Sequence, residues 1–351
     1  MKEIRLNAEL LRRKVPNLTV AAKSIGIRPA TVSNLCTGKI DLGKAEVRTL
    51  VGLASLANCT VDELILKEVK GNMIPTHIKV LDFFAPVVAG GTVGIVARPG
   101  MGQLVILAEL LHRLKESTYE TILLMPESTT ADMKELADLA NYVVTSIEEA
   151  FDKMTKQDSE IVFFTDRSYI ISGDLLDLQE RLVGQKTREI TTILVDISGD
   201  VVDEDMPYGP LESLWQLDAD LAARQLFPAI HPLHSTSSIV ESIDLDQKHS
   251  TLRQRAQQLL RRYKELRSFV NLHGKERLQE KDIAIFNRGE LLESYFTQPL
   301  FVAEAFTKQT GLEVSLTETL RDVEIILDGR ADRLTPEQLL YIGSINTNKL
   351  Q

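Results

Sequence analysis

The sequence TVGIVARPGMGQL, residues 92–104, places an apolar run before a glycine-rich turn and a second apolar run after it. The run Thr92–Val96 is rich in the β-branched residues of a buried strand. Gly100 and Gly102 supply the backbone freedom that a tight turn needs. A strand that passes through such a turn into a helix points bare backbone N–H groups at an anion. The stretch therefore predicts a phosphate-binding loop in an α/β sheet.

The end of this loop differs from that of a working phosphate loop. A working loop ends in Gly-Lys-Ser or Gly-Lys-Thr, where the lysine contacts the outer phosphates and the hydroxyl holds magnesium. Gln103 and Leu104 occupy those two places. Phosphoryl transfer depends on positioned cations, so we expect weak nucleotide binding or none, and no efficient catalysis. Taken alone, the loop is equally well explained as a purely structural strand–turn–helix. The candidate phosphate contacts are Gly100, Gly102, Gln103 and Leu104.

The pattern on either side of the loop divides the 351 residues into three parts. Residues 1–70 hold short helical segments and no convincing strand, residues 71–245 alternate apolar strands with amphipathic helices, and residues 246–351 are helical. The alternation is typical of a parallel sheet covered by helices. We expect a P-loop (RecA-like) α/β domain between two all-α domains. Its predicted strands are Thr92–Val96, Thr121–Met125, Ile161–Thr165 and Thr191–Asp196, and capping boxes are predicted at Ser315–Glu318 and Thr335–Gln338.

Composition and charge limit the class of protein. Hydrophobic residues make up 44% of the chain and charged residues 26%, as in a folded soluble protein. The sequence has no apolar run long enough to cross a bilayer, no secretory leader and two cysteines, so we expect a cytoplasmic protein without membrane insertion. Residues 1–71 hold twelve Lys and Arg against seven Asp and Glu, a net charge of +5, whereas the rest of the chain has a net charge of −15. The N-terminal part alone is suited to a polyanion.

That N-terminal part contains two short helical patterns separated by a glycine. The first covers residues 19–25, with Ile25 expected to face inward, and the second covers residues 29–36. Gly26 allows the tight turn between them. Two helices joined in this way can lay the second helix in a major groove.

The stretch GIRPATVSNLCTGK, residues 26–39, precedes a helical pattern at residues 44–57 and the sequence TVDELIL. It resembles the lambda-repressor/Cro-like helix-turn-helix family, which implies that residues 1–70 bind DNA and that the second helix reads bases. Arginine prefers guanine edges and asparagine prefers adenine, while a lysine after the helix can meet phosphate. The alternative is a helical module that uses the same fold for oligomerisation or protein docking. The candidate DNA-binding residues are Arg28, Ala30, Thr31, Ser33, Asn34 and Lys39.

Four blocks of sequence follow one another in the remainder of the chain. They are IKVLDFFAPVVAGGTVGIVARPGMG (78–102), LFPAIHPLHSTSSIVES (226–242), QQLLRRYKELRSFVNLHG (257–274) and YFTQPLFVAEAFT (295–307). In this order they resemble the ATP synthase β subunit family, and the resemblance extends over residues 72–345. It implies a β-like body of the kind that forms rings with other P-loop ATPase subunits.

The same resemblance implies a nucleotide site that has lost some of its parts. Glu127 falls where the family has the glutamate that orients the attacking water. Asp166 falls where it has the aspartate that holds magnesium through water, and Leu300 replaces an aromatic residue of the adenine pocket. The implied cofactor is ATP or ADP with Mg. The residues that match the adenine pocket are Phe227, Ala303 and Phe306.

Each of these residues also has a structural explanation. Asp166 can cap the loop after its strand, Glu127 can be a solvated turn residue, and the two phenylalanines can be ordinary core aromatics. His231 and His234 have the spacing of metal ligands, but no third ligand is evident, so we expect no metal there.

Two main hypotheses follow. In the first, the chain is a DNA-binding regulator or scaffold whose pseudo-ATPase body forms a homo-oligomer or ring and so multiplies weak DNA contacts. In the second, it is a non-catalytic β-like subunit of a rotary-type or other P-loop ATPase assembly, and the helical head is a protein adaptor. A third hypothesis is an active ATPase with unconventional residues, which the substitution Glu127→Gln would test.

Overall fold

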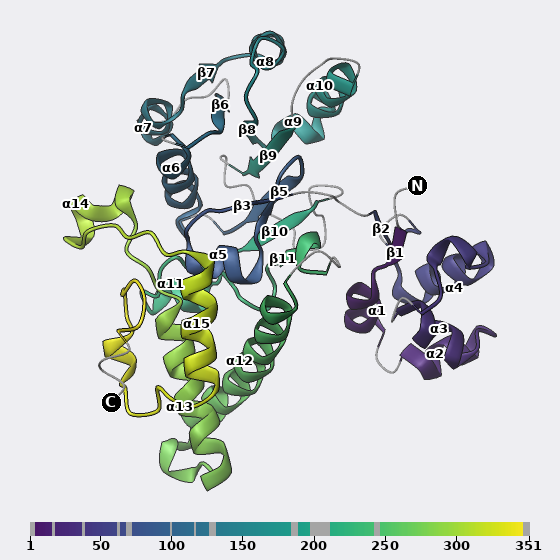
Figure 1. Ribbon diagram of the computed structural model, residues 1–351, viewed down its shortest axis with the longest axis vertical. Helices are drawn as coiled ribbons and strands as arrows, with labels where there is room; N and C mark the ends of the chain where they lie inside the picture. The colour runs from purple at the N-terminus through teal and green to yellow at the C-terminus, as the bar shows by residue number, and fades with distance from the viewer. Residues whose placement is uncertain are drawn as a thin grey trace. The chain divides into compact units, whose positions relative to one another are not determined.

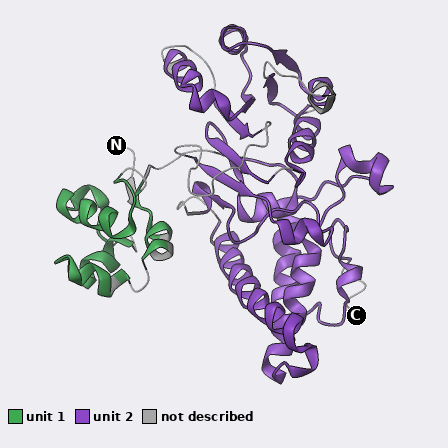
Figure 2. Cartoon of the chain, turned by 180° about the vertical axis from the view of Figure 1, so that it is seen from behind, with its two compact units in different colours: residues 1–70 green, residues 71–351 purple. Residues whose placement is uncertain are grey.

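The computed structural model describes residues 4–15, 18–36, 39–61, 64–67, 72–98, 100–115, 117–125, 131–183, 189–196, 211–241 and 246–346. The chain forms two compact units, Met1–Lys70 and Gly71–Gln351 (Figure 2). Among the helices within the described ranges, none has both the length and the apolar composition needed to span a membrane.

The first unit is a set of short helices with a two-stranded sheet. In that sheet β1 and β2 are antiparallel, with Leu6 opposite Ile65. The sequence-based expectation that this part contains no strand is wrong. Strands of three residues are too short to show an alternating pattern, and this pair joins segments from opposite ends of the unit. The elements are β1 (Ile4–Leu6), α1 (Ala8–Lys14), α2 (Leu18–Ser24), α3 (Pro29–Cys36), η1 (Leu42–Lys44), α4 (Val47–Ala57) and β2 (Ile65–Lys67).

A seven-stranded sheet forms the centre of the second unit (Figure 1). Its strand order is β11-β10-β5-β9-β8-β6-β7, and only β10 and β11 are antiparallel neighbours. The four predicted strands are present as β5, β6, β8 and β9, each within one residue of its predicted bounds. The elements are β3 (Met73–Ile74), α5 (Lys79–Phe84), β4 (Val87–Val88), β5 (Thr92–Val96), α6 (Gln103–Leu114), β6 (Glu120–Leu124), α7 (Ala131–Leu139), β7 (Tyr142–Val144), α8 (Ile147–Met154), β8 (Ile161–Asp166), α9 (Ser168–Ile171), α10 (Asp174–Val183), β9 (Ile190–Val195), β10 (Ser213–Gln216), α11 (Ala219–Ala223), β11 (Thr236–Ser237) and η2 (Ser238–Glu241).

Helices cover both faces of the sheet because the central strands bury both of their faces. Val162 and Phe164 of β8 belong to an apolar cluster that includes residues of α6 and α7. Ile161 and Phe163 of the same strand belong to a second cluster, with residues of α8 and α10. Successive side chains of a strand point to opposite faces, so a continuous apolar run is what a doubly covered strand requires.

The C-terminal part of the second unit is helical. The helices α12, α13 and α15 pack against one another (Figure 1). A Cβ at Gly289 of α13 would lie 2.3 Å from Cγ of Tyr263 on α12, so these two helices approach closely at the glycine. Both predicted capping boxes are present, at the starts of α15 and η5. The elements are α12 (Gln247–His273), η3 (Lys275–Arg277), α13 (Glu280–Tyr295), η4 (Phe301–Ala303), α14 (Glu304–Thr307), α15 (Leu316–Leu327) and η5 (Pro336–Gln338).

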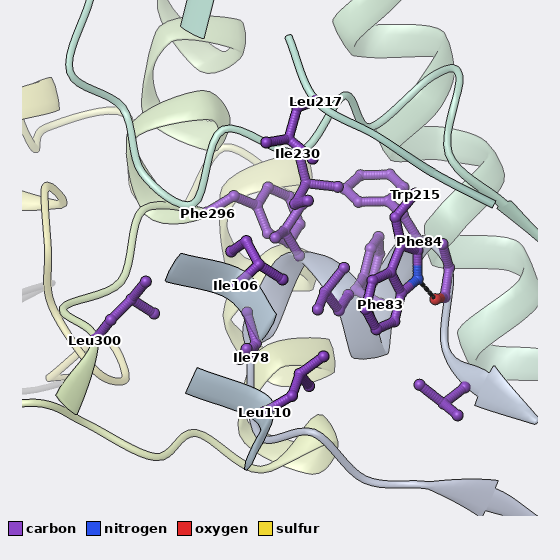
Figure 3. Packing of buried hydrophobic residues seen from close by; sticks show 14 of the residues in the cluster. Ile78, Phe83, Phe84, Ile106, Leu110, Trp215, Leu217, Ile230, Phe296 and Leu300 are labelled. Atoms are coloured by element: carbon purple, nitrogen blue, oxygen red, sulfur yellow. Dashed lines mark hydrogen bonds between the residues drawn. The ribbon is translucent and has the colours of Figure 1, made fainter. Parts of the chain in front are cut away.

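One apolar cluster joins the sheet to this helical region. Phe83 and Phe84 of α5 are fully buried, and their rings lie 5.4 and 4.9 Å from the ring of Phe296, which follows α13. Trp215 of β10 is also fully buried, and its indole N–H donates to the carbonyl of Ala85 at 2.7 Å (Figure 3). The sheet and the C-terminal helices therefore share a core.

Candidate functional site

The loop between β5 and α6 has a backbone suited to an anion. Gly100 and Gly102 have φ angles of 81° and 93°, and among the described residues other than their chain neighbours no heavy atom lies within 4 Å of the place that a Cβ would take at either glycine. Gly102 is also the N-cap of α6, which begins at Gln103, and a glycine has no side chain to cap the N–H groups of the first turn. Free N–H groups at the start of a helix favour an anion, so the loop offers an open cradle for phosphate.

The residue at the metal-ligand position of the loop cannot hold magnesium. Leu104 is partly buried and packs against the main apolar cluster, where a catalytic loop has its metal-binding hydroxyl. Asp166 is 5% exposed and accepts a hydrogen bond from the N–H of Ser168 at 2.8 Å. The carboxylate therefore caps the turn after β8, which is the structural explanation that the sequence left open for it.

A cation that the sequence analysis missed lies next to Asp166. The guanidinium of Arg167 is 3.8 Å from the carboxylate of Asp196, and 16% and 8% of the two side chains are exposed. The N–H of Arg167 donates to the carbonyl of Val195 at 2.9 Å, which joins the ends of β8 and β9. The signal that could have found this residue is its position, directly after a buried parallel strand, where ligand-binding side chains gather in open α/β sheets.

The predicted adenine-pocket residues lie on two segments, of which one contacts α6. The N–H of Val302 donates to the carboxylate of Glu109 on α6 at 3.1 Å, which holds η4, and with it Ala303, against that helix. Phe227 is 38% exposed, and its carbonyl accepts a hydrogen bond from the N–H of Gln298 at 2.9 Å. The loop of Phe227 is therefore bound to the same C-terminal stretch that continues into η4.

The other aromatic position of the predicted pocket is not packed. Phe306 on α14 is 88% exposed, whereas Leu300 is 5% exposed and belongs to the main apolar cluster. Leu300 thus fills a core position, whereas Phe306 lies largely exposed.

A buried ion pair fixes α6 to the C-terminal segments. The side chains of Glu109 and Arg113 are 0% and 2% exposed and lie 2.7 Å apart. Arg113 also donates to the carbonyl of Leu312 at 2.9 Å and to that of His77 at 3.3 Å. The helix that begins at the phosphate loop therefore cannot shift without breaking these hydrogen bonds.

The two histidines with metal-like spacing have a structural role. The rings of His231 and His234 stack with centroids 3.8 Å apart, and Nδ1 of His231 accepts the N–H groups of Leu233 and His234 at 3.1 and 3.2 Å. Burial, and then the neighbouring His234, lowers the pKa of His231 to about 4, so its ring is neutral at pH 7. In the described parts of the chain, no group of three His, Cys, Asp or Glu residues could hold a metal ion. Glu127, the predicted catalytic residue, lies outside the described residues.

In the first unit, α2 and α3 are joined through a turn at Gly26, whose φ is 79°. Val32 and Leu35 are the buried residues of α3. Ile25, expected to face inward, is 40% exposed, although its Cδ1 would lie only 3.0 Å from a Cβ at Gly52 of α4. The predicted DNA-binding residues are on the outer side of α3 or next to one of its ends: Arg28, Ala30, Ser33 and Lys39 are exposed, and Thr31 and Asn34 are partly exposed.

The sheet and the C-terminal helices define the fold class. A mostly parallel seven-stranded sheet and a helical C-terminal region are consistent with a P-loop ATPase-like fold. Residues 241–336 match the family described as the C-terminal domain of V and A type ATP synthase. Among solved structures, the fold is similar to that of "a unique ATP synthase subunit NeqB from Nanoarcheaum equitans", with a TM-score of 0.57 and 18% sequence identity, over 74% of this chain and 77% of that one. At this identity, the likeness to NeqB is one of fold.

Proposed function

We propose that this chain is a non-catalytic, ATP synthase β-like subunit of a rotary-type or other P-loop ATPase assembly. The observation that carries the proposal is Leu104. In a body whose helical region matches that of V and A type ATP synthases, the position of the metal-binding hydroxyl holds a leucine that packs into the core. A charge-assisted hydrogen bond of the kind a loop lysine makes is worth about 1.5–3 kcal/mol, and Gln103 does not supply it. Efficient phosphoryl transfer by the chain alone is therefore not expected.

In this proposal the chain assembles with subunits whose own loops are intact. The test is to tag the full chain, express it at its natural level and identify what co-purifies after mild crosslinking. We expect a P-loop partner with a Gly-Lys-Ser or Gly-Lys-Thr loop. In the control, the tag expressed without the chain should not retain this partner. Recovery of the chain only as a self-assembled homo-oligomer or ring would contradict the proposal.

The loop can still bind a nucleotide through its backbone. The cradle at Gly100 and Gly102 and the start of α6 would hold phosphate, and Phe227 would stack on the base. Titration calorimetry with ATP and ADP, with and without magnesium, tests this point. We expect weak binding that magnesium does not strengthen, since Leu104 is not a ligand. Fast magnesium-dependent hydrolysis by the purified chain, abolished in Gln103→Met, would show that the chain is catalytic after all.

A second candidate function, DNA binding by residues 1–70, is favoured by the exposed face of α3 and by the charge of this unit. Ser33 is exposed on a short helix after a glycine turn, Arg28 is exposed directly before that helix, and residues 1–70 have a net charge of +5. An arginine that reads a base contributes about 1–3 kcal/mol, so Arg28→Ala should weaken binding by about 5-fold or more. Arg48→Ala removes an exposed arginine of α4 and is the matched control. An electrophoretic shift assay that finds no affinity at low salt would reject DNA binding and favour a protein adaptor.

A further inference from the structure

The side chain of Tyr341, near the end of the described chain, contacts the loop that carries Phe227. The hydroxyl of Tyr341 accepts the N–H of Phe227 at 3.2 Å and donates to the carbonyl of Gln225. The backbone N–H of Tyr341 in turn donates to the hydroxyl of Thr297 at 2.7 Å. Tyr341 has a φ of 54°, in a region that a non-glycine residue adopts only when its surroundings fix it there. These contacts therefore hold one defined geometry.

The residues just after Tyr341 are bound to buried charged groups. The ammonium of Lys79, which is fully buried, donates to the carbonyls of Ile342 at 2.8 Å and Gly343 at 3.4 Å. The carboxylate of Asp322, also fully buried, accepts the N–H of Ile345 at 2.7 Å. The segment is thus bound to α5 through Lys79 and to α15 through Asp322, while the side chain of Tyr341 contacts the loop of Phe227.

The backbone N–H and carbonyl of Phe227 are both hydrogen-bonded to residues of the C-terminal part of the chain. Its N–H goes to Tyr341 and its carbonyl to the N–H of Gln298. Gln225, two residues earlier, has a φ of 58°, so this loop also adopts a backbone that a non-glycine residue does not prefer. Phe227 is nevertheless 38% exposed. The loop geometry that presents this side chain therefore depends on contacts with Gln298 and Tyr341, both far away in the sequence.

We propose that residues 341–345 form a strap that fixes the Gln225–Phe227 loop, and that Tyr341 is the positioning residue that keeps the ring of Phe227 presented to a flat ligand. Together with the proposed nucleotide site, on which this ligand assignment rests, the strap sets the stacking surface for a base. The ligand class is a nucleotide, because the ring offers a π-face for a base and the loop at Gly100 and Gly102 offers anion-binding amides for phosphate.

The test compares the full chain with Tyr341→Phe, which removes the hydroxyl and keeps the ring. The matched control is Tyr142→Phe, at the far edge strand β7. Amide hydrogen exchange should rise at least tenfold at residues 225–227 in Tyr341→Phe and stay unchanged in the control, with the melting temperature of both near that of the wild type. ATP affinity, measured by calorimetry, should fall severalfold in Tyr341→Phe alone.

Unchanged exchange at residues 225–227 would overturn the strap. If the wild type binds ATP and Tyr341→Phe raises exchange at residues 225–227 without changing ATP affinity, Tyr341 does not act as a positioning residue for the ligand. If the wild type does not bind ATP but exchange rises, the strap stands and the proposed nucleotide site is wrong. Thr297→Val is the second variant, in case Tyr341→Phe does not fold: it removes the acceptor of the Tyr341 N–H and should raise exchange at residues 225–227 and 341.

Discussion

Replacing Arg113 by methionine should leave a carboxylate without its partner inside the contact between α6 and the C-terminal segments. Glu109 and Arg113 form a 2.7 Å ion pair in which both side chains are almost completely buried. Methionine keeps most of the apolar stem but none of the donors to Glu109, His77 and Leu312. Of the hydrogen bonds described for the Glu109 carboxylate, the one from the N–H of Val302 would remain.

The size of the effect follows from the cost of a stranded charge. Removing one partner of a buried ion pair destabilises a protein by about 3–5 kcal/mol. A stranded carboxylate can limit this cost by taking up a proton, which for an ordinary glutamate costs ~3.7 kcal/mol at pH 7 and ~1 kcal/mol at pH 5. The folded variant then binds a proton that the unfolded chain does not bind, so the variant recovers stability as the pH falls. We expect a deficit of about 4 kcal/mol at pH 7 that shrinks to about 1–2 kcal/mol at pH 5.

The assay is urea unfolding followed by the fluorescence of Trp215. This residue is the single tryptophan of the chain and is fully buried in the cluster that joins the sheet to the C-terminal helices. The double variant Glu109→Met/Arg113→Met is the control, because an apolar pair in place of a buried ion pair is often neutral. A deficit below about 1 kcal/mol at pH 7, or one that does not change between pH 7 and pH 5, would refute the reasoning.

Three further predictions concern single residues. Gln103→Lys should tighten ATP binding about tenfold in calorimetry, since a charge-assisted hydrogen bond is worth ~1–1.5 kcal/mol more than a neutral one. If Gln103→Lys and Gln103→Met bind ATP with equal affinity, the phosphate does not lie at this loop. Burial lowers the pKa of Lys79 to about 7 from its ordinary 10.5, so between these values the unfolded chain binds more protons than the folded one. From pH 7 to pH 10 the unfolding free energy of the wild type should therefore rise by up to about 1.4 kcal/mol per pH unit relative to Lys79→Met, and parallel pH curves would contradict this. Gly289→Ala should lower the melting temperature and cost about 1–3 kcal/mol despite the better helix propensity of alanine, because its Cβ would collide with Tyr263; an equal or higher melting temperature would disprove the clash.

The central strands could be predicted from the sequence because they are buried on both faces. Such strands are continuous apolar runs, and Ile161–Thr165 was predicted almost as β8 runs, Ile161–Asp166. The strands β7, β10 and β11 were not predicted. They are two to four residues long and include polar residues such as Ser213 and Gln216, so their sequence carries no period, and their pairing depends on neighbours distant in the chain.

The candidate site could be predicted only where one stretch of chain determines it. The glycines of the loop and the start of α6 are local, and the structure places them as an open cradle. The contacts of Phe227 with Gln298 and Tyr341 join segments far apart in the sequence, so no pattern signals them. The exposure of Phe306 depends likewise on how α14 packs, and a resemblance of sequence does not report it.

The packing of Leu104 also bears on which substitutions the loop tolerates. A threonine at this position would supply a hydroxyl but would leave a polar group and a smaller side chain against the apolar cluster. A metal-binding hydroxyl here would therefore lower the stability of the protein unless a second substitution refilled the core. The identity of residue 104 is thus coupled to the packing of the core beneath the loop.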